Sequence, residues 1–203
     1  MNKRSAGGRH RAQRGVAAIE FALVAIVFLM IVFGIIELAR IIYMYNTLAD
    51  VTRSAARSAA NIDWRSTTLM DQARQRAIFR DNAGTLAFGA PITDQYIRID
   101  YFYHAKDAVS GAITMAPVSA MPECPARNRH NCHTSPYSNG TSAADTCVRL
   151  VRARICSPDD AACGRVNYQM LLPLIDLTVP LPTSTTLVTA ETLGYQPGDP
   201  DCL

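Results

Sequence analysis

The chain has 203 residues, which is enough for one compact domain together with a membrane anchor. Its formal net charge of +3 is spread unevenly. Residues 1–60 carry eight Lys and Arg against three Asp and Glu, whereas residues 61–203 carry twelve against fourteen. This distribution argues against a nucleic-acid-binding domain, because such a domain carries its own basic surface.

Residues 1–15 form a basic leader with five Lys and Arg and no acidic residue. Small and polar residues dominate it, so we expect a disordered segment that buries no core. By the positive-inside rule, a basic leader stays in the cytoplasm and directs the chain after the next apolar segment outward.

Residues 16–36 are apolar except for Glu20 and Gly34. A helix of this length rises about 30 Å, the thickness of the hydrocarbon core of a bilayer. A cleaved signal peptide is the alternative, but its apolar run is usually shorter and a small-x-small cleavage site follows it. Here the apolar pattern resumes in residues 37–43. We therefore predict a retained transmembrane anchor.

The helical pattern continues through residues 37–60, with apolar residues at helical spacing and no Gly or Pro. An unbroken helix from Val16 to Ala60 would be about 68 Å long. The alanine-rich run at residues 52–60 has two interpretations. Small residues permit close approach of a helix from another subunit, or they form a high-propensity helix that packs on its own domain.

Glu20 is the one acidic residue within the apolar segment. A carboxylate inside a bilayer costs about 2.5–3.5 kcal/mol even on lenient insertion scales, so it usually has a partner. One interpretation places Glu20 at the membrane interface, where water hydrates it. The other gives it a specific partner, and the neighbouring residues favour this second interpretation.

The run Arg14-Gly15-Val16-Ala-Ala-Ile-Glu20-Phe21 resembles the class III processing site of type IV prepilins. It is most similar to the TadE/TadF-like pseudopilins of tight-adherence (Flp, type IVb/IVc-like) pilus systems, and the alanine-rich run is typical of them too. The resemblance implies that a prepilin peptidase cuts between Gly15 and Val16. Glu20 then becomes the fifth mature residue, followed by Phe21.

The resemblance also implies a function and a set of partners. We expect a non-catalytic minor pseudopilin that supports assembly of an adhesive pilus, and hence adhesion and biofilm formation. Its expected partners are the membrane, the prepilin peptidase, other pilins and pseudopilins and the pilus assembly platform, with no cofactor and no nucleic acid. The expected location is the bacterial inner membrane, in a single pass, with a cytoplasmic N-terminus and a periplasmic outer domain.

In such families the glutamate is implicated in subunit recruitment. Processing creates an α-amino group on Val16, one helical turn before Glu20. In a bundle of helices, the Glu20 carboxylate of one subunit can pair with the Val16 ammonium of a neighbour, which reduces the cost of burying either charge. Two alternatives remain: a signal-anchored periplasmic enzyme or binding protein with a pocket in residues 85–203, and a type II secretion pseudopilin.

Residues 61–203 predict a pilin-like α+β domain in which an antiparallel sheet of three to four strands packs on the long N-terminal helix. A second helix is expected from Thr68, capped through Thr68 and Asp71, to about residue 80. The predicted strands are residues 96–103, 147–156, 168–181 and 185–192. Residues 104–146 read as a long loop, and residues 194–203 as a tail.

All six cysteines lie in the last 80 residues: Cys124, Cys132, Cys147, Cys156, Cys163 and Cys202. An even number confined to one region predicts disulfides formed in an oxidising compartment. Six cysteines allow 15 pairings, and the sequence does not choose among them.

Two other patterns suggest chemistry less strongly. Cys124, His130, Cys132 and His133 are zinc-ligand types, but their spacing matches no common zinc finger, so we expect no metal site. Asp159 and Asp160 could form a pair of catalytic carboxylates, but their position between Pro158 and Cys163 favours a turn.

Overall fold

The computed structural model describes residues 14–134, 137, 145–171 and 178–198. Most of the predicted leader and the cysteine at position 202 lie outside these residues. The chain divides into two compact units, Met1–Arg40 and Ile41–Leu203, and each is described by itself.

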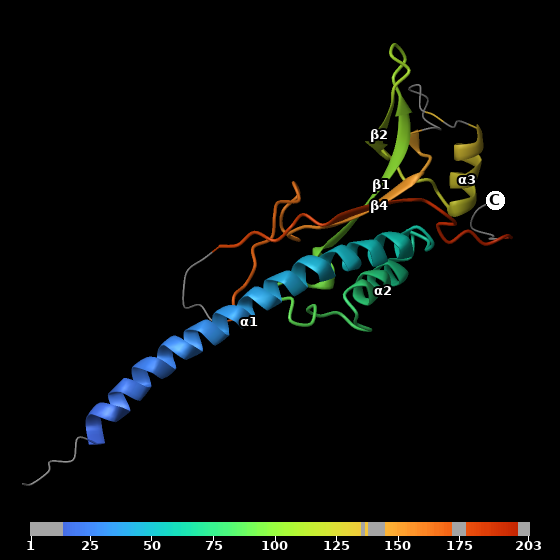
Figure 1. Ribbon diagram of the computed structural model, residues 1–203. Coiled ribbons are helices and arrows are strands. Elements are labelled where there is room, and N and C mark those ends of the chain that lie inside the picture. Colours follow the sequence, from blue (N-terminus) through green and yellow to red (C-terminus); the bar gives the residue numbers. More distant parts are fainter. Residues whose placement is uncertain (1–13, 135–136, 138–144, 172–177, 199–203) are drawn as a thin grey trace, which may run out of the picture. The chain divides into compact units, whose positions relative to one another are not determined.

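The predicted long helix is confirmed as α1, Arg14–Ala59, which begins in the first unit and ends in the second (Figure 1). It ends where Asn61 donates its side-chain amide to the carbonyl of Arg57 at 3.0 Å, which satisfies one of the last helical carbonyls.

The second unit is built around the last turns of α1. Its core combines α1 with the sheet and with the segments that follow α2, and the buried residues are Met44, Leu48, Val51, Ala55, Ala56, Ala77, Ile78, Leu86, Ile92, Ile97, Ala153, Ile155, Val166, Tyr168 and Leu181. A second cluster lies at the end of α1, where Ala59, Ala60, Met70, Val148, Val151 and Leu193 pack together. The buried α1 residues of both clusters recur every three to four positions, which places them on one face of the helix.

The second helix is α2, Thr67–Ala77. Its N-cap is Ser66, whose hydroxyl accepts a hydrogen bond from the Leu69 amide at 3.3 Å. The predicted cap at Thr68 is therefore wrong, because Thr68 already lies within the helix. The helix also ends before residue 80, since Phe79 adopts the left-handed backbone conformation with φ 61°.

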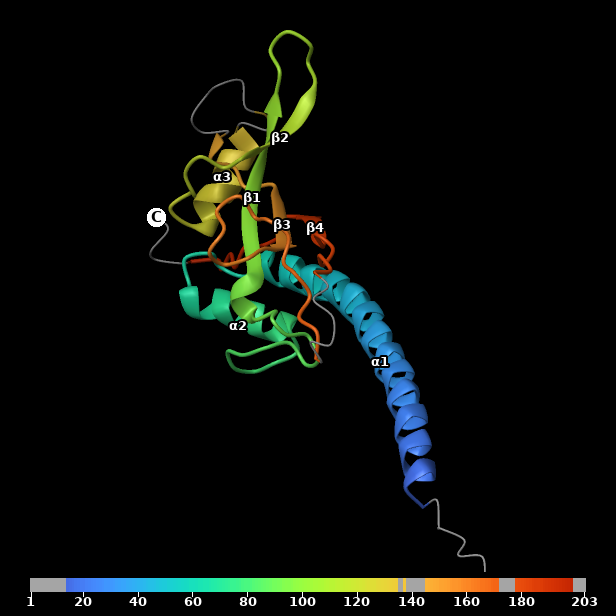
Figure 2. The ribbon, with the colours of Figure 1, turned by 90° about the vertical axis from the view of Figure 1, so that its left-hand side faces the viewer.

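Four antiparallel strands form one sheet in the order β2-β1-β3-β4. Their bounds are β1, Ile97–Lys106; β2, Ile113–Pro117; β3, Leu150–Ile155; and β4, Thr185–Thr189, with a short 3₁₀ turn, η1, at Asp94–Tyr96 before β1. The strands predicted at 96–103, 147–156 and 185–192 are confirmed. Pairing of β1 with β3 stops at Phe102, whereas pairing with β2 reaches Lys106, so the β1–β2 hairpin extends past the other strands (Figure 2).

The prediction of a long loop at residues 104–146 is wrong for much of its length. It contains β2 and a helix, α3, Pro125–Thr134. Both elements have weak sequence signals, because the β2 side chains are mostly exposed and α3 buries only Pro125 and Asn128. Tertiary contacts hold α3: Asn128 accepts from the Val148 amide at 2.7 Å and donates to the Val148 carbonyl at 3.2 Å.

The strand predicted at residues 168–181 is not a sheet strand in the described residues, and residues 172–177 lie outside them. The Tyr168 amide donates to the Val179 carbonyl, and the Leu181 amide to the Val166 carbonyl, each at 2.8 Å. The two ends of this segment therefore bond to one another. The prolines within it explain the outcome, since proline supplies no amide for a sheet ladder.

Because Ser66 supplies the N-cap of α2, we expect Ser66→Ala to lower the free energy of unfolding by about 1 kcal/mol. Thr68→Ala removes a similar hydroxyl at the second residue of the helix and serves as the matched control, with little expected effect. Denaturant titration of the purified chain followed by circular dichroism measures both. Equal losses in the two variants would contradict the capping role of Ser66.

Candidate functional site in the N-terminal helix

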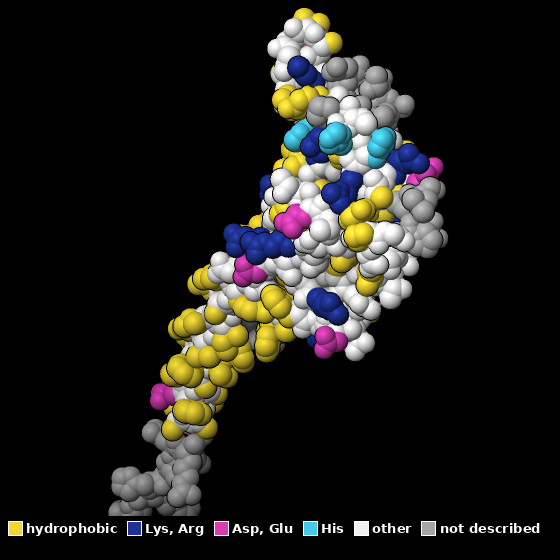
Figure 3. Space-filling model, turned by 90° about the vertical axis from the view of Figure 1, so that its right-hand side faces the viewer, with side chains coloured by type: hydrophobic (Ala, Val, Ile, Leu, Met, Phe, Trp, Pro, Cys, Tyr) yellow, Lys and Arg dark blue, Asp and Glu magenta, His cyan; other side chains and the backbone are white. Residues whose placement is uncertain are grey.

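The first unit presents an exposed apolar helix. Its large apolar side chains from residue 16 to residue 38 are between 38 % and 75 % exposed, apart from Val32, which is half-buried. Within the described parts of the chain, α1 is the one helix long and apolar enough to cross a membrane. Figure 3 shows hydrophobic side chains covering the visible surface of this segment.

The predicted processing residues lie at the start of this helix. Gly15 and Val16 are in the first turn of α1, and Val16 is 55 % exposed. Glu20 is exposed one turn later, and Phe21 beside it is 75 % exposed. The predicted cut site, the glutamate and the aromatic residue therefore all lie near the start of α1.

Glu20 belongs to an apolar stripe along one side of α1. Val24, Val27, Ile31 and Gly34 follow it at alternating spacings of three and four residues, which places them within about 40° of Glu20 around the helix axis. Leu23, Val24, Val27, Phe28 and Ile31 line a shallow open hollow of about 430 Å³ on the same side. The carboxylate therefore stands at the head of a continuous apolar surface.

Gly34 is the last residue of this stripe, and it is not among the site residues predicted from the sequence. A Cβ atom at Gly34 would meet no atom within 4 Å, so the fold of the single chain does not require glycine there. Glycine in a helix interior costs about 1 kcal/mol relative to alanine. The spacing of Gly34 from Glu20 was the signal in the sequence that could have revealed it.

The apolar stretch ends at a pair of opposite charges. Arg40 Nη1 lies 3.7 Å from Glu37 Oε2, one turn earlier on α1, and both side chains are largely buried. Neighbouring opposite charges reduce the cost of placing either one near a membrane.

The alanine-rich run packs within its own domain. Ala55, Ala56 and Ala59 are fully buried, whereas Arg53 and Arg57 on the same stretch of helix are exposed. Of the two interpretations, packing on the domain is confirmed, and the alanines are not available to another subunit.

The structure forms disulfides between Cys132 and Cys147 and between Cys156 and Cys163, with Cα–Cα distances of 4.9 Å and 4.6 Å. Cys124 is disulfide-bonded as well. The Cys132 sulfur is therefore committed to a disulfide and is not a zinc ligand. No group of three metal-ligating side chains occurs among the residues described.

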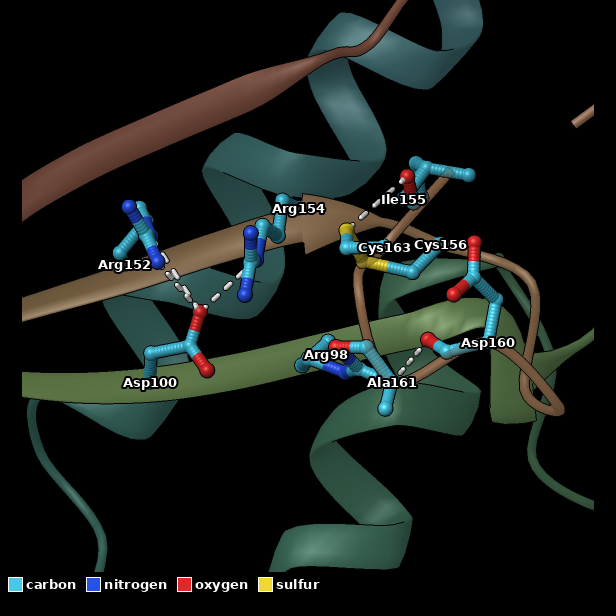
Figure 4. Close-up of polar contacts among 9 residues, drawn as sticks. All are labelled: Arg98, Asp100, Arg152, Arg154, Ile155, Cys156, Asp160, Ala161 and Cys163. Carbon is cyan, nitrogen blue, oxygen red and sulfur yellow. Dashed lines mark hydrogen bonds and ion pairs between the residues drawn. A yellow bond between two sulfur atoms is a disulfide. The ribbon is translucent and has the colours of Figure 1, made fainter. Parts of the chain in front are cut away.

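The outer face of the sheet carries an ion cluster, shown in Figure 4. Asp100 Oδ2 on β1 accepts hydrogen bonds from Arg152 Nε and Nη2 on β3 at 3.2 and 3.0 Å. Arg154 Nε lies 2.9 Å from the same oxygen as an ion pair. The Arg152 guanidinium also stacks on the Phe102 ring, 4.4 Å from its centroid. One carboxylate thus pairs with two cations that are about a quarter exposed.

The Arg98 guanidinium forms hydrogen bonds with the loop after β3. It donates to the carbonyls of Asp160 and Ala161 at 2.8 Å each. The Asp160 carboxylate accepts from the amides of Ala162 and Gly164 at 2.8 and 2.6 Å, so the turn interpretation of this acid is confirmed. Arg98 and Asp160 therefore serve loop structure.

Among the described residues of the outer domain, Tyr101 and Asp107 have shifted pKa values. Burial raises the pKa of Tyr101 to about 12, and its hydroxyl lies 3.7 Å from Met70 Sδ. The backbone amide of Ser110, followed by its hydroxyl and the Val109 amide, lowers the pKa of Asp107 at the tip of the hairpin. Both shifts move away from neutral pH, where a general acid or base would operate.

Because Asp100 forms ion pairs with both Arg152 and Arg154, we expect Asp100→Asn to lower the free energy of unfolding by about 1–2 kcal/mol. This loss of stability should be smaller at high salt, which screens the ion pairs. Asp71→Asn is the matched control, since Asp71 is more exposed and forms an ion pair with Arg74. Its expected effect is within about 0.5 kcal/mol. Thermal unfolding at low and high salt measures both variants, and equal effects would contradict the cluster's role.

Comparison with known proteins identifies the N-terminal segment. Residues 15–57 match the model of a family described as TadE-like protein. No curated protein and no solved structure matches the chain. The matched segment is most of α1, and it includes Gly15, Glu20 and Gly34. Over residues 15–57 of its 203, the chain is therefore similar to the TadE-like proteins.

Proposed function

We propose that the chain is a minor pseudopilin that supports assembly of a tight-adherence pilus. The observation that carries the proposal is the TadE-like match over α1, in which Glu20 heads an exposed apolar stripe. A solvent-exposed apolar helix of this length is unfavourable in water, and a membrane followed by a bundle of like helices gives it two suitable environments.

In this proposal residues 1–15 are a cytoplasmic leader that prepilin peptidase removes, and residues 16–36 span the inner membrane. Residues 37–60 continue the helix outside, and residues 61–203 form the periplasmic domain. The basic leader and the disulfides support this orientation, because the first favours the cytoplasm and the second an oxidising compartment.

The proposed role of Glu20 follows from its place on the stripe. After processing, Val16 carries the new ammonium group, which adds to the positive end of the helix dipole. A second helix packed along the stripe would place the Glu20 carboxylate in an apolar seam, where only an opposite charge can offset its desolvation. The Val16 ammonium of a neighbouring subunit supplies that charge.

We expect Glu20→Gln to leave cleavage after Gly15 intact and to reduce incorporation of the subunit at least about tenfold, because a buried charge loses its partner. Mass spectrometry of the membrane fraction gives the mature N-terminus, and co-purification with the other pilins measures incorporation. Asp50→Asn removes one exposed carboxylate from the same helix and is the matched control.

Two outcomes would count against this proposal. Normal incorporation of the Glu20→Gln variant would remove the pairing role. A mature chain that starts at Met1, or after Ile36, irrespective of the peptidase would favour the signal-anchored periplasmic protein instead.

Gly34 gives a second test of the stripe. We expect Gly34→Leu to leave the fold unchanged, since no atom lies near its Cβ, and to impair incorporation by separating the packed helices. Ala22→Leu adds the same side chain on the opposite side of the helix and should be tolerated. Comparable incorporation of the two variants would show that the stripe is not the packing surface.

A further inference from the structure

Two open hollows lie along the last turns of α1, on the side where helix α2 runs beside it. Their volumes are about 320 and 560 Å³, and Arg57 and Ser58 line both of them, so the hollows meet at these residues. Residues of α2 line the smaller hollow together with those of α1, and Figures 1 and 2 show the two helices side by side. We call the two hollows together the α1–α2 groove. Its residues all belong to the second unit.

The smaller hollow carries two positive charges and no negative one. Arg57 in the last turn of α1 and Arg76 in the last turn of α2 both line it, and both are exposed. Neither guanidinium has a hydrogen bond or an ion pair with any residue that the structure describes. No Asp or Glu is among the residues that line this hollow. Because the two cations repel each other, an anionic occupant would be favoured there.

The charges at the far end of the larger hollow differ from these. Arg53 Nη1 lies 3.1 Å from Asp50 Oδ1, one turn earlier on α1, so these two charges offset each other. The net positive charge of the groove is therefore concentrated at Arg57 and Arg76.

Exposed apolar side chains flank the two arginines. Phe79 in the larger hollow is 65 % exposed, and Leu69 in the smaller hollow is 42 % exposed. Phe79 is held in this position, because Ile78 before it is buried in the core and its own amide donates to the Arg76 carbonyl at 2.9 Å. Burial of exposed apolar side chains is favourable. The groove therefore offers apolar contacts beside its positive charge.

The dimensions of the groove suit a helix. From Asp50 to Ser58 its α1 side is about 12 Å long, or slightly more than two helical turns. Ser54 and Ser58 lie one turn apart on this side, and their small side chains let another backbone approach. A helix that binds in a groove is anchored by its apolar face. Acidic residues at the border of that face would meet Arg57 and Arg76.

A second copy of this chain does not supply such a helix from the residues that the structure describes. Within the second unit, α1 has Asp50 as its one acidic residue, α2 has Asp71, and α3 has none. Both carboxylates already form ion pairs with arginines of their own helices. The charge of the groove is therefore complementary to a helix of a different protein.

We propose that the α1–α2 groove binds an amphipathic helix of another protein, with at least two acidic residues at the border of its apolar face. Arg57 and Arg76 contact the acidic residues, and Phe79 and Leu69 contact the apolar face. The inference uses contacts of the second unit alone. It depends neither on the pilus role nor on the position of the domain relative to a membrane.

The test is photo-crosslinking of the full chain in cells of its own organism. The photoreactive residue p-benzoylphenylalanine replaces Phe79, and in a control chain it replaces Val109, which is 97 % exposed on the β1–β2 hairpin. Mass spectrometry identifies the crosslinked peptide. Arg57→Gln and Arg76→Gln are introduced singly and together, and Arg127→Gln, an exposed arginine of α3, is the matched control. Circular dichroism of the purified variants checks their fold.

We expect the chain with the photoreactive residue at position 79, and not the Val109 control, to crosslink to a peptide of another protein with two acidic residues within one helical turn. The crosslinked fraction should fall about threefold in each single arginine variant and about tenfold in the double variant, because each change removes one exposed ion pair. Arg127→Gln should leave it unchanged. Crosslinking lost in Arg57→Glu should return when the facing acidic residue of the partner is exchanged for arginine.

Several results would overturn the inference. They are a crosslink to a lipid, a crosslink to a second copy of the chain, and a crosslinked peptide without acidic residues. Absence of any crosslink at position 79 would overturn it as well. An equal crosslinked fraction in the double arginine variant and in Arg127→Gln would show that the charge of the groove does not bind the partner.

Discussion

The packing of the last turns of α1 against the sheet is the contact on which the outer domain depends. A four-stranded sheet of short strands is stable only when one face is covered. Ala55, Ala56 and Ala59 are buried in the two clusters that join this helix to the sheet, and Met44 and Leu48 are buried nearer the start of the unit. Exchange of these alanines for larger residues would force helix and sheet apart.

The earlier part of the same helix obeys a different constraint. In a lipid environment a helix satisfies its own backbone hydrogen bonds, so this segment needs apolar side chains and no tertiary partner. Two of its residues serve neither need. Glu20 adds a charge and Gly34 weakens the helix, and both lie on one side. The proposed packing against other helices would account for both residues with one surface.

The connections of the outer domain are held by covalent and polar contacts in place of a large core. The Cys132–Cys147 disulfide joins α3 to the segment before β3, and Asn128 adds two hydrogen bonds at the same point. The Cys156–Cys163 disulfide closes the loop after β3, which Arg98 also binds. Such fastening suits a domain whose long connections bury few apolar side chains.

The sequence by itself determined the elements with strong periodic patterns. These are the apolar helix that continues beyond residue 36, the strands β1, β3 and β4, and the prediction of disulfides. The TadE-like segment was recognisable for the same reason, since its motif is local and rests on Gly15, Glu20 and Phe21. Processing and the pairing of Glu20 stay predictions, because they depend on a peptidase and on other subunits.

Only the tertiary structure decided the features that depend on distant contacts. The helix α3 forms because Asn128 reaches Val148, and β2 forms because β1 offers it an edge, although the side chains of both elements are mostly polar or exposed. The alanines turned inward because the sheet covers them, which no local pattern reveals. Disulfide pairing and the outward position of Phe79 likewise follow from how the chain folds back on itself, and helical or strand periodicity carries no information about either.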